Sequence, residues 1–234
     1  MHHAKIFLLL VVSLLLTACS GMRTGSAKAT LDSSNTVAVA SLLGQTFHGV
    51  HVGTTVFGNT SYEAPVPEWN IDAMTEQKVI AHLAQTASRK AIALQRDSEL
   101  RSRLEKANSF FTGTDYQEVA NLAKQQGADT VILIQPVRYD NAPFHKPGYG
   151  FFERTFFGAS QRCIYSLFIV SVISTASGKQ AGWEWGFPCE FGEKELEWKE
   201  GLDKYSEKEL QLLRRKTEEA VEQNVRKALK GLGY

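Results

Sequence analysis

The sequence predicts an α+β domain in which helices pack on a mixed sheet of four to five strands. Three observations predict this class. Short apolar stretches rich in β-branched residues recur along the chain, and other stretches place apolar residues at helical spacing. One helical stretch runs directly into a continuous apolar strand, as in half of a β-α-β unit. The chain has 234 residues, which is enough for one well-formed core.

The first half of the domain begins with strands and continues with helices. The apolar stretch 36–43 predicts a strand, and valines at every second position predict another within 46–59. Two prolines break the pattern over 59–70, which predicts a loop. Apolar residues at helical spacing then predict one helix over 74–94 and a shorter one over 97–107.

A helix followed by a buried strand is the clearest pattern in the chain. Thr114 or Asp115 can cap the helix, and Gly127 ends it. The buried side of this helix is predicted to consist of Tyr116, Val119, Ala120 and Ala123. The segment TVILIQPV (130–137) is a continuous apolar run, typical of a strand buried on both faces.

A hairpin and a long helix complete the predicted domain. Two strands flank Ala176-Ser177-Gly178, which is typical of a hairpin turn, and the first of them is apolar on both faces and therefore central. Ser206 and Glu209 form a capping box that opens the C-terminal helix. At roughly 37 Å, this helix is long enough to cross the sheet.

The N-terminal segment predicts export. The apolar run from Ile6 to Leu16 would span roughly 16 Å as a helix, about half of a bilayer core, which favours a signal peptide over a membrane-spanning helix. The small, polar residues that follow predict a flexible tether. The predicted organisation is therefore a signal peptide at 1–18, a lipid-anchored tether at 19–35 and a single periplasmic domain at 36–234.

The order Leu16-Thr17-Ala18-Cys19 resembles the lipobox of bacterial lipoproteins. The resemblance implies that Cys19 is the first mature residue and carries a diacylglycerol and a fatty acid such as palmitate. Several acyl chains together hold a protein stably on a membrane, whereas one does not. Ser20, where an aspartate would retain the protein at the inner membrane, implies the outer membrane. The alternative is a plain secretory signal with a cysteine near its cleavage site.

Charge and cysteine content support two further predictions, one about nucleic-acid binding and one about a disulfide. The 26 basic and 25 acidic residues nearly balance, so the chain lacks the basic excess typical of nucleic-acid binding. Cys163 and Cys189 lie equally far from Ala176 in the predicted hairpin turn, which places them opposite each other and predicts a disulfide. A register offset of one or two residues would instead leave two reduced thiols.

The order of elements resembles the periplasmic domains related to CsgG, LpoB, PelC and the amino-terminal domain of TolB. The shared motifs are the opening Val37-Ala38-Val39, the Gly127-Ala128-Asp129 before an apolar strand, and the turn at 175–179 followed by a tryptophan. The resemblance implies a lipid-anchored adaptor or assembly factor, often oligomeric, that contacts other envelope proteins. The chain has no evident pair of membrane-spanning hairpins, so pore formation is not expected.

The sequence supports neither a metal site nor an enzyme. The histidines considered as ligands are His48, His51, His82 and His145. On a strand, the first two would point to opposite faces, which is poor for chelation. The glutamates at 193–197 lie in a charged run that is typical of a solvated surface, and no phosphate-binding or nucleophile motif is present. We therefore expect a non-enzymatic protein without cofactors.

The segment 139–162 does not fit a core strand. It is rich in glycine and aromatic residues and lacks periodicity, which predicts a functional loop. We expect this loop to bind partners through Phe151, Phe152, Phe156 and Phe157, since aromatic residues are typical anchors of interfaces. The alternative is that the loop folds back and buries these rings.

Two functions follow. The first is a lipid-anchored outer-membrane protein that serves as a non-enzymatic adaptor for envelope proteins. The second is a small-ligand or glycan-binding lipoprotein that uses Tyr149, Trp183 and Trp185 as a stacking surface. The accessibility of the tryptophan face discriminates between them, since an open, concave face favours ligand binding.

Overall fold

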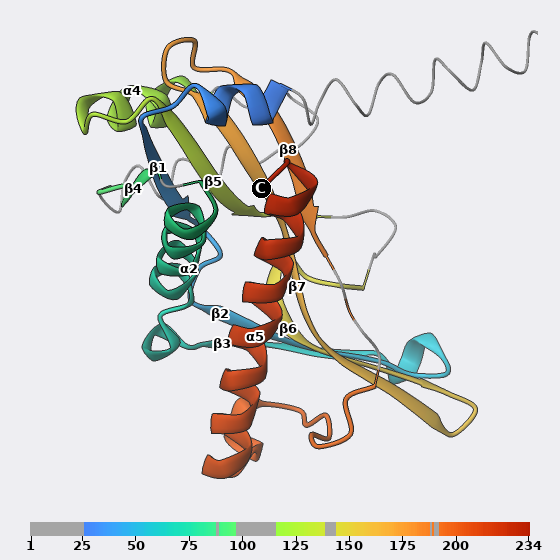
Figure 1. Cartoon of the computed structure of the whole chain (residues 1–234). Coiled ribbons are helices and arrows are strands. Elements are labelled where there is room, and N and C mark those ends of the chain that lie inside the picture. The colour runs from blue at the N-terminus through green and yellow to red at the C-terminus, as the bar shows by residue number, and fades with distance from the viewer. Residues whose placement is uncertain (1–25, 88, 97–115, 139–143, 188, 190–191) are drawn as a thin grey trace, which may run out of the picture.

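The computed structural model describes residues 26–234 except 88, 97–115, 139–143, 188 and 190–191 (Figure 1). It contains a mixed sheet of eight strands, more than the four or five that the sequence predicts. The strands are β1 (Thr36–Ser41), β2 (Thr46–Val52), β3 (Thr60–Pro65), β4 (Lys90–Ala93), β5 (Thr130–Pro136), β6 (Gly148–Phe156), β7 (Ala159–Ser174) and β8 (Gln180–Gly186). A helix at residues 26–32 precedes β1. The other helices among the described residues are α2 (Ile71–Ala87), α4 (Gln117–Gln125) and α5 (Glu207–Gly231), with short 3-10 turns η1 (Val56–Gly58), η2 (Pro67–Trp69) and η3 (Leu202–Lys204). The α+β class is therefore confirmed.

The long strand β7 is shared by two parts of the sheet. Its C-terminal half pairs with β5 on one edge and β8 on the other, and its N-terminal half pairs with β6. Tyr165 pairs with both Gly150 of β6 and Cys189 beyond β8, so β6 lies on the same edge of β7 as β5. We call β4, β1, β5, β8 and the C-terminal half of β7 the helix-covered limb. We call β3, β2, β6 and the N-terminal half of β7 the hairpin limb (Figure 1).

Each limb contains a parallel pair of strands at the corresponding position. In the helix-covered limb β1 lies parallel to β5, and in the hairpin limb β2 lies parallel to β6. The chain passes from β1 to β2 through residues 42–45 and from β5 to β6 through residues 137–147. Each of these strands therefore continues into the second limb after a break, whereas β7 passes through both without interruption.

Helices cover both faces of the helix-covered limb. Alternate residues of β1 face opposite sides, so Val37 and Val39 pack under α2 and α5, while Ala38 and Ala40 pack under α4. The capping box of Ser206 and Glu209 is confirmed, and it sets the start of α5. The side of α5 that faces the sheet consists of Leu213, Thr217, Val221, Asn224, Val225, Ala228 and Leu229. The central position predicted for β7 is also confirmed, because strands flank it on both edges.

Three strands lie where the sequence predicts none. The segment 59–70, predicted as a loop, forms β3, and its prolines lie at or beyond the end of that strand. The end of the helix predicted over 74–94 is instead β4, a short edge strand parallel to β1. The predicted loop 139–162 contains β6 and the start of β7. Pairing with neighbouring strands decides these segments, and local pattern does not encode it.

The packed domain also extends further toward the N-terminus than the sequence predicts. Residues 26–32, assigned above to the tether, form a helix in which Ala27 and Leu31 are fully buried. Asp32 of this helix pairs with Arg89 at 3.0 Å and accepts a hydrogen bond from the Tyr234 hydroxyl at 2.5 Å. The helix predicted over 97–107 and the capping residues Thr114 and Asp115 lie outside the described residues.

Candidate interaction surface at the hairpin tips

Two turns form the end of the hairpin limb. The turn between β2 and β3 contains η1, and the turn between β6 and β7 consists of Phe157 and Gly158. The strands that lead into these turns are neighbours, with Val52 paired to Arg154, and the Thr54 hydroxyl donates to the Thr155 carbonyl at 3.4 Å. The two turns therefore lie at the same end of the sheet. We call residues 53–59 and 155–159 together the hairpin tips (Figure 1).

The β6–β7 turn has an unusual residue for its geometry. Phe157 and Gly158 have φ angles of 46° and 80°, both in the left-handed region that two-residue hairpin turns of type I′ require. Glycine adopts this conformation freely, but an L-residue with a bulky side chain carries a cost of roughly 1–2 kcal/mol there. Asparagine or aspartate would form this turn more readily. Turn formation therefore does not account for phenylalanine at this position.

The β2–β3 turn depends on close backbone contact. A Cβ atom at Gly53 would lie 2.9 Å from backbone atoms of Gly58, so only a residue without a side chain allows the two segments to approach. This closure presents Val56 and Phe57 at the end of the turn. Gly53 and Gly58 are therefore needed to close this turn, which lies beside the β6–β7 turn.

The tips expose large apolar side chains. The exposed fractions are 76% for Val56, 95% for Phe57, 55% for Phe156 and 83% for Phe157. Within the part of the chain that the structure describes, Phe144 is the only other large apolar residue that is exposed, at 50%. Scattered apolar residues on a surface are ordinary, whereas a group of them at one end of a molecule is a candidate interaction surface.

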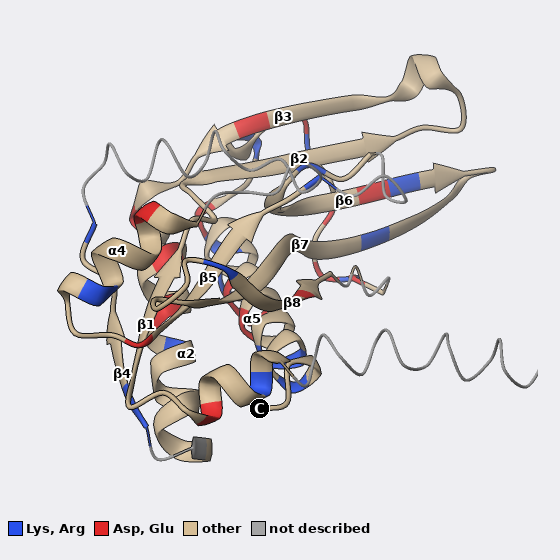
Figure 2. Cartoon of the chain, turned by 90° about the horizontal axis from the view of Figure 1, so that it is seen from above, with Lys and Arg blue, Asp and Glu red and all other residues tan. Residues whose placement is uncertain are grey.

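Charge is absent from the tips and concentrated behind them. Residues 53–60 and 155–161 include no charged side chain, and the ends of the hairpins carry neither basic nor acidic colour in Figure 2. The nearest charged residues of β6 are Glu153 and Arg154, and the Arg154 guanidinium lies 5.8 Å from the ring centre of Phe156. An uncharged apolar end with polar groups set back from it is typical of the centre and rim of a binding surface.

A buried ion pair links the strands that lead into the hairpin tips. Glu153 is only 7% exposed and pairs with Arg162 across the β6–β7 hairpin. The second oxygen of Glu153 lies 3.1 Å from Nδ1 of His51 on β2, so one carboxylate links three strands. Behind it, the His51 ring contacts the Trp198 ring at 5.1 Å. The register of the hairpins is therefore fixed close to the exposed residues.

The four phenylalanines predicted to bind partners separate into two pairs. Phe156 and Phe157 lie at the tip, with ring centres 4.5 Å apart. Phe151 and Phe152 lie in the middle of β6 and are 0% and 3% exposed, so the prediction of an exposed loop is wrong for them. They pack on opposite faces of the sheet, in different core clusters. Val56 and Phe57 were missed, although the uncharged stretch 53–60 could have indicated them.

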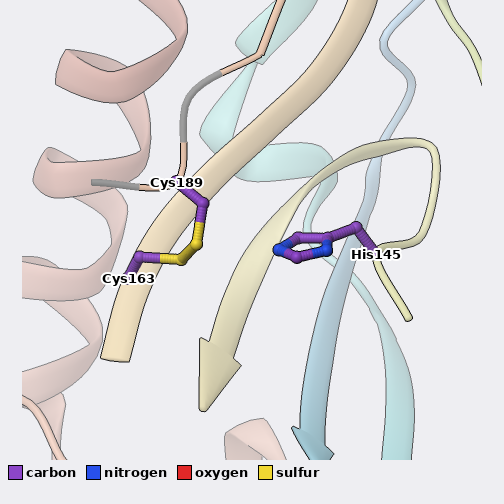
Figure 3. Close-up of side chains that lie close together, drawn as sticks. All are labelled: His145, Cys163 and Cys189. Carbon is purple, nitrogen blue, oxygen red and sulfur yellow. A yellow bond between two sulfur atoms is a disulfide. The ribbon is translucent and has the colours of Figure 1, made fainter. Parts of the chain in front are cut away.

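The predicted disulfide is present, with a different register from the one expected. Cys163 and Cys189 are joined, and their Cα atoms are 5.4 Å apart (Figure 3). Cys189 lies directly opposite Tyr165, two positions from Cys163. One position arises at the turn, where Ile173 pairs with Gln180, and the other from the irregularity between Val172 and Ile173. The bond therefore runs diagonally between neighbouring positions. It ties the end of the β8 segment to the hairpin limb.

The four histidines considered as metal ligands do not gather at one place. His48 and His51 lie on β2, and His82 lies on α2. His145 lies beside the disulfide, where its ring stacks on Phe152 with centres 4.2 Å apart (Figure 3). Burial lowers the pKa of His145 to about 4, so the ring is neutral near pH 7.

Only part of the stacking surface considered for a glycan ligand is accessible. Tyr149 is fully buried, and its hydroxyl donates to the Gly44 carbonyl at 3.0 Å. Trp183 and Trp185 share a face of β8 and lie half-buried against a core cluster. Their ring centres are 5.7 Å apart. A shallow cleft of about 260 Å³ occurs instead on the hairpin limb, beside Val50, Thr60 and Phe144. It is smaller than the roughly 300–1,000 Å³ typical of small-molecule sites.

Comparison with known proteins gives no assignment. No protein-family model, no curated protein and no solved structure matches the chain. Among the described residues, no helix combines the length and apolar character needed to cross a membrane. The position of Cys19 lies outside the described residues.

Proposed function

We propose that this protein is a lipid-anchored cell-envelope protein that acts as a non-enzymatic adaptor and docks onto another envelope protein through the hairpin tips. The observation that supports this most directly is the exposure of Val56, Phe57, Phe156 and Phe157 at one uncharged end of the sheet. The lipid anchor is Cys19, in the lipobox-like sequence at residues 16–19. The outer membrane is the proposed location because Ser20 follows the cysteine.

The energy available at the tips suits a protein contact. Complete burial of one valine or phenylalanine side chain is worth roughly 1.5–3 kcal/mol, so four of them supply at most roughly 6–12 kcal/mol before the cost of association. Aromatic residues in the centre of a contact contribute most of such energy. The strained turn at Phe157 is consistent with this role, because the residue there costs stability in the free protein.

The position of the tips directs them away from the anchor. Residues 34–36 bond to Asp129 and Thr130, and Thr130 pairs with Ser174 at the C-terminal end of β7. The tips lie at the opposite end of this strand, whose 16 residues extend about 50 Å (Figure 1). The chain from Cys19 to residue 26 reaches at most about 25 Å. This arrangement favours a partner in the periplasm.

Site-specific photo-crosslinking in cells tests the docking surface. A photoreactive residue replaces Phe57 or Phe157 in one strain each, and Arg215 in a control strain. Arg215 is also well exposed, at 64% of its side chain, but lies on α5 and outside the hairpin tips. We expect one envelope protein to be captured at both tips and not at Arg215. Capture of lipid alone, or equal capture at Arg215, contradicts the proposal, and self-capture at the tips would replace the partner with a second copy.

The lipid anchor is tested separately. Cys19→Ala should abolish incorporation of labelled palmitate and release the protein from the membrane fraction. Cys163→Ala is the matched control, because it removes a cysteine of the domain and should leave labelling unchanged. A Cys19→Ala variant that still carries the label would disprove the anchor without bearing on the tips.

A further inference from the structure

Three groups that can bind a metal ion lie together beside β7, one of them buried and two partly buried. His145 precedes β6, Cys163 lies on β7, and Cys189 follows β8 (Figure 3). One nitrogen of His145 and the two sulfur atoms all lie within 4.8 Å of one another. Three segments that are distant in the sequence thus bring a borderline nitrogen ligand and two soft sulfur ligands to one point, the ligand types that bind zinc.

The imidazole of His145 lacks the contacts that a buried ring usually has. Neither Nδ1 nor Nε2 has a hydrogen-bond partner among the described residues, although both atoms are buried. Buried polar atoms in proteins are nearly always paired, so an unpaired ring nitrogen beside two sulfurs requires an explanation. The ring is fixed by stacking on Phe152 and by edge contacts with Tyr165 and Phe187, at 4.2, 4.9 and 5.3 Å between centres. A metal-binding nitrogen is therefore already oriented.

We propose that His145, Cys163 and Cys189 form a redox-controlled zinc site, which is closed while the disulfide is present and opens when it is reduced. A dithiol transfers two electrons and two protons to the disulfide, so the S–S bond breaks, two thiols form and the dithiol becomes a disulfide. Zn²⁺ then replaces the two thiol protons, which pass to solvent, and forms two zinc–sulfur bonds and one zinc–nitrogen bond. Water completes a tetrahedral set.

Charge favours zinc over a monovalent metal. Two thiolates and Zn²⁺ together are neutral, whereas two thiolates with Cu⁺ leave one negative charge. The surrounding side chains include Phe152, Tyr165 and Phe187, and Cys163 itself is fully buried. An uncompensated charge in such a place is costly. The described part of the chain offers no further histidine, cysteine or acid in this cluster.

Titration with Co²⁺ tests the site, because Co²⁺ replaces zinc and absorbs light when sulfur binds it. The mature full-length protein, reduced with a phosphine and freed of excess reductant without air, is compared with the same protein left oxidised. We expect one equivalent of Co²⁺ to give sulfur-to-cobalt and tetrahedral d–d absorption in the reduced protein only. Excess Zn²⁺ should remove both bands. Absence of the bands in the reduced protein overturns the proposal.

A variant of the histidine tests its share in the site. His145→Gln should weaken Co²⁺ binding by more than about tenfold, since loss of even an outer partner of a metal site costs that much. His82→Gln, on the surface of α2, is the matched control and should bind as the parent does. Circular dichroism of the reduced proteins shows whether each remains folded. Equal affinity in a folded His145→Gln variant contradicts the assignment of this ligand.

Discussion

The helix-covered limb and the hairpin limb share the strand β7, but they differ in how far their apolar residues are covered. In the first, β7 lies between β5 and β8, and its residues are buried beneath α5 on one face. In the second, the same strand forms a hairpin whose end exposes apolar rings. Both limbs contribute buried residues to the core, but only the end of the hairpin limb exposes large apolar side chains that do not add to it.

The largest expected effect lies where α5 packs on the sheet. Leu213→Ala should lower the free energy of unfolding by about 2–5 kcal/mol, because Leu213 lies on the sheet-facing side of α5, is fully buried, and the change leaves a cavity. Leu212→Ala, next to it but only partly buried, should cost less. Chemical denaturation measures both. Similar losses in the two variants would show that α5 does not provide the core contact described above.

Removal of the disulfide should destabilise the hairpin limb more than the helix-covered limb. Cys163→Ala combined with Cys189→Ala should cost roughly 3 kcal/mol, given the sequence separation of 26 residues. Hydrogen exchange should accelerate mainly in residues 159–167 of β7, and much less in residues 168–174. Equal acceleration along the whole strand would mean that the limbs open as one unit.

A change at the tip should move stability and binding in opposite directions. Phe157→Asn relieves the cost of a bulky residue at a φ of 46° and should stabilise the protein by about 1 kcal/mol. Partner capture at the tips should fall at the same time. Thermal unfolding and crosslinking yield measure the two effects. A destabilised variant would show that Phe157 contributes to folding rather than to contact.

The smallest effect concerns pH at the start of α5. Hydrogen bonds from Lys199 and from Ser206 hold the pKa of Glu209 near 2, below its usual 4.5. Because the pKa is lower in the folded state, the stabilisation is complete above about pH 4.5 and is lost as the pH falls toward 2. The difference in unfolding midpoint between the parent and Glu209→Gln should therefore shrink between pH 7 and pH 3. A constant difference would indicate that the charge is not involved.

The local sequence pattern was sufficient to predict helix ends and turns that are set by residues close to them in the chain. The stop at Gly127 has a φ of 79°, the cap at Ser206 is satisfied, and Gly178 has the positive φ that its turn needs. Strands β4 and β6 have no such reason, since they pair with β1 and β2, which are distant in the chain. β3 follows β2 directly, but its prolines hide the strand pattern. Caps and turns therefore have local signals, whereas the pairing of strands does not.

The same distinction applies to the candidate sites. Phe156 and Phe157 were expected to be exposed, but Phe151 and Phe152, in the same segment, are buried because β2 and β7 pair on either side of them. His145 lies beside Cys163 and Cys189 only because the chain returns to β7 from two directions. No spacing along the sequence encodes that proximity.

The unbroken course of β7 has a mechanical consequence. A pull on the hairpin tips, opposed by the end of the domain that carries residues 26–36, runs parallel to this strand. Its hydrogen bonds to β5, β6 and β8 lie across that direction, so the load is shared among many bonds that must yield together. The fold is thereby suited to carry tension between two attachments at its opposite ends.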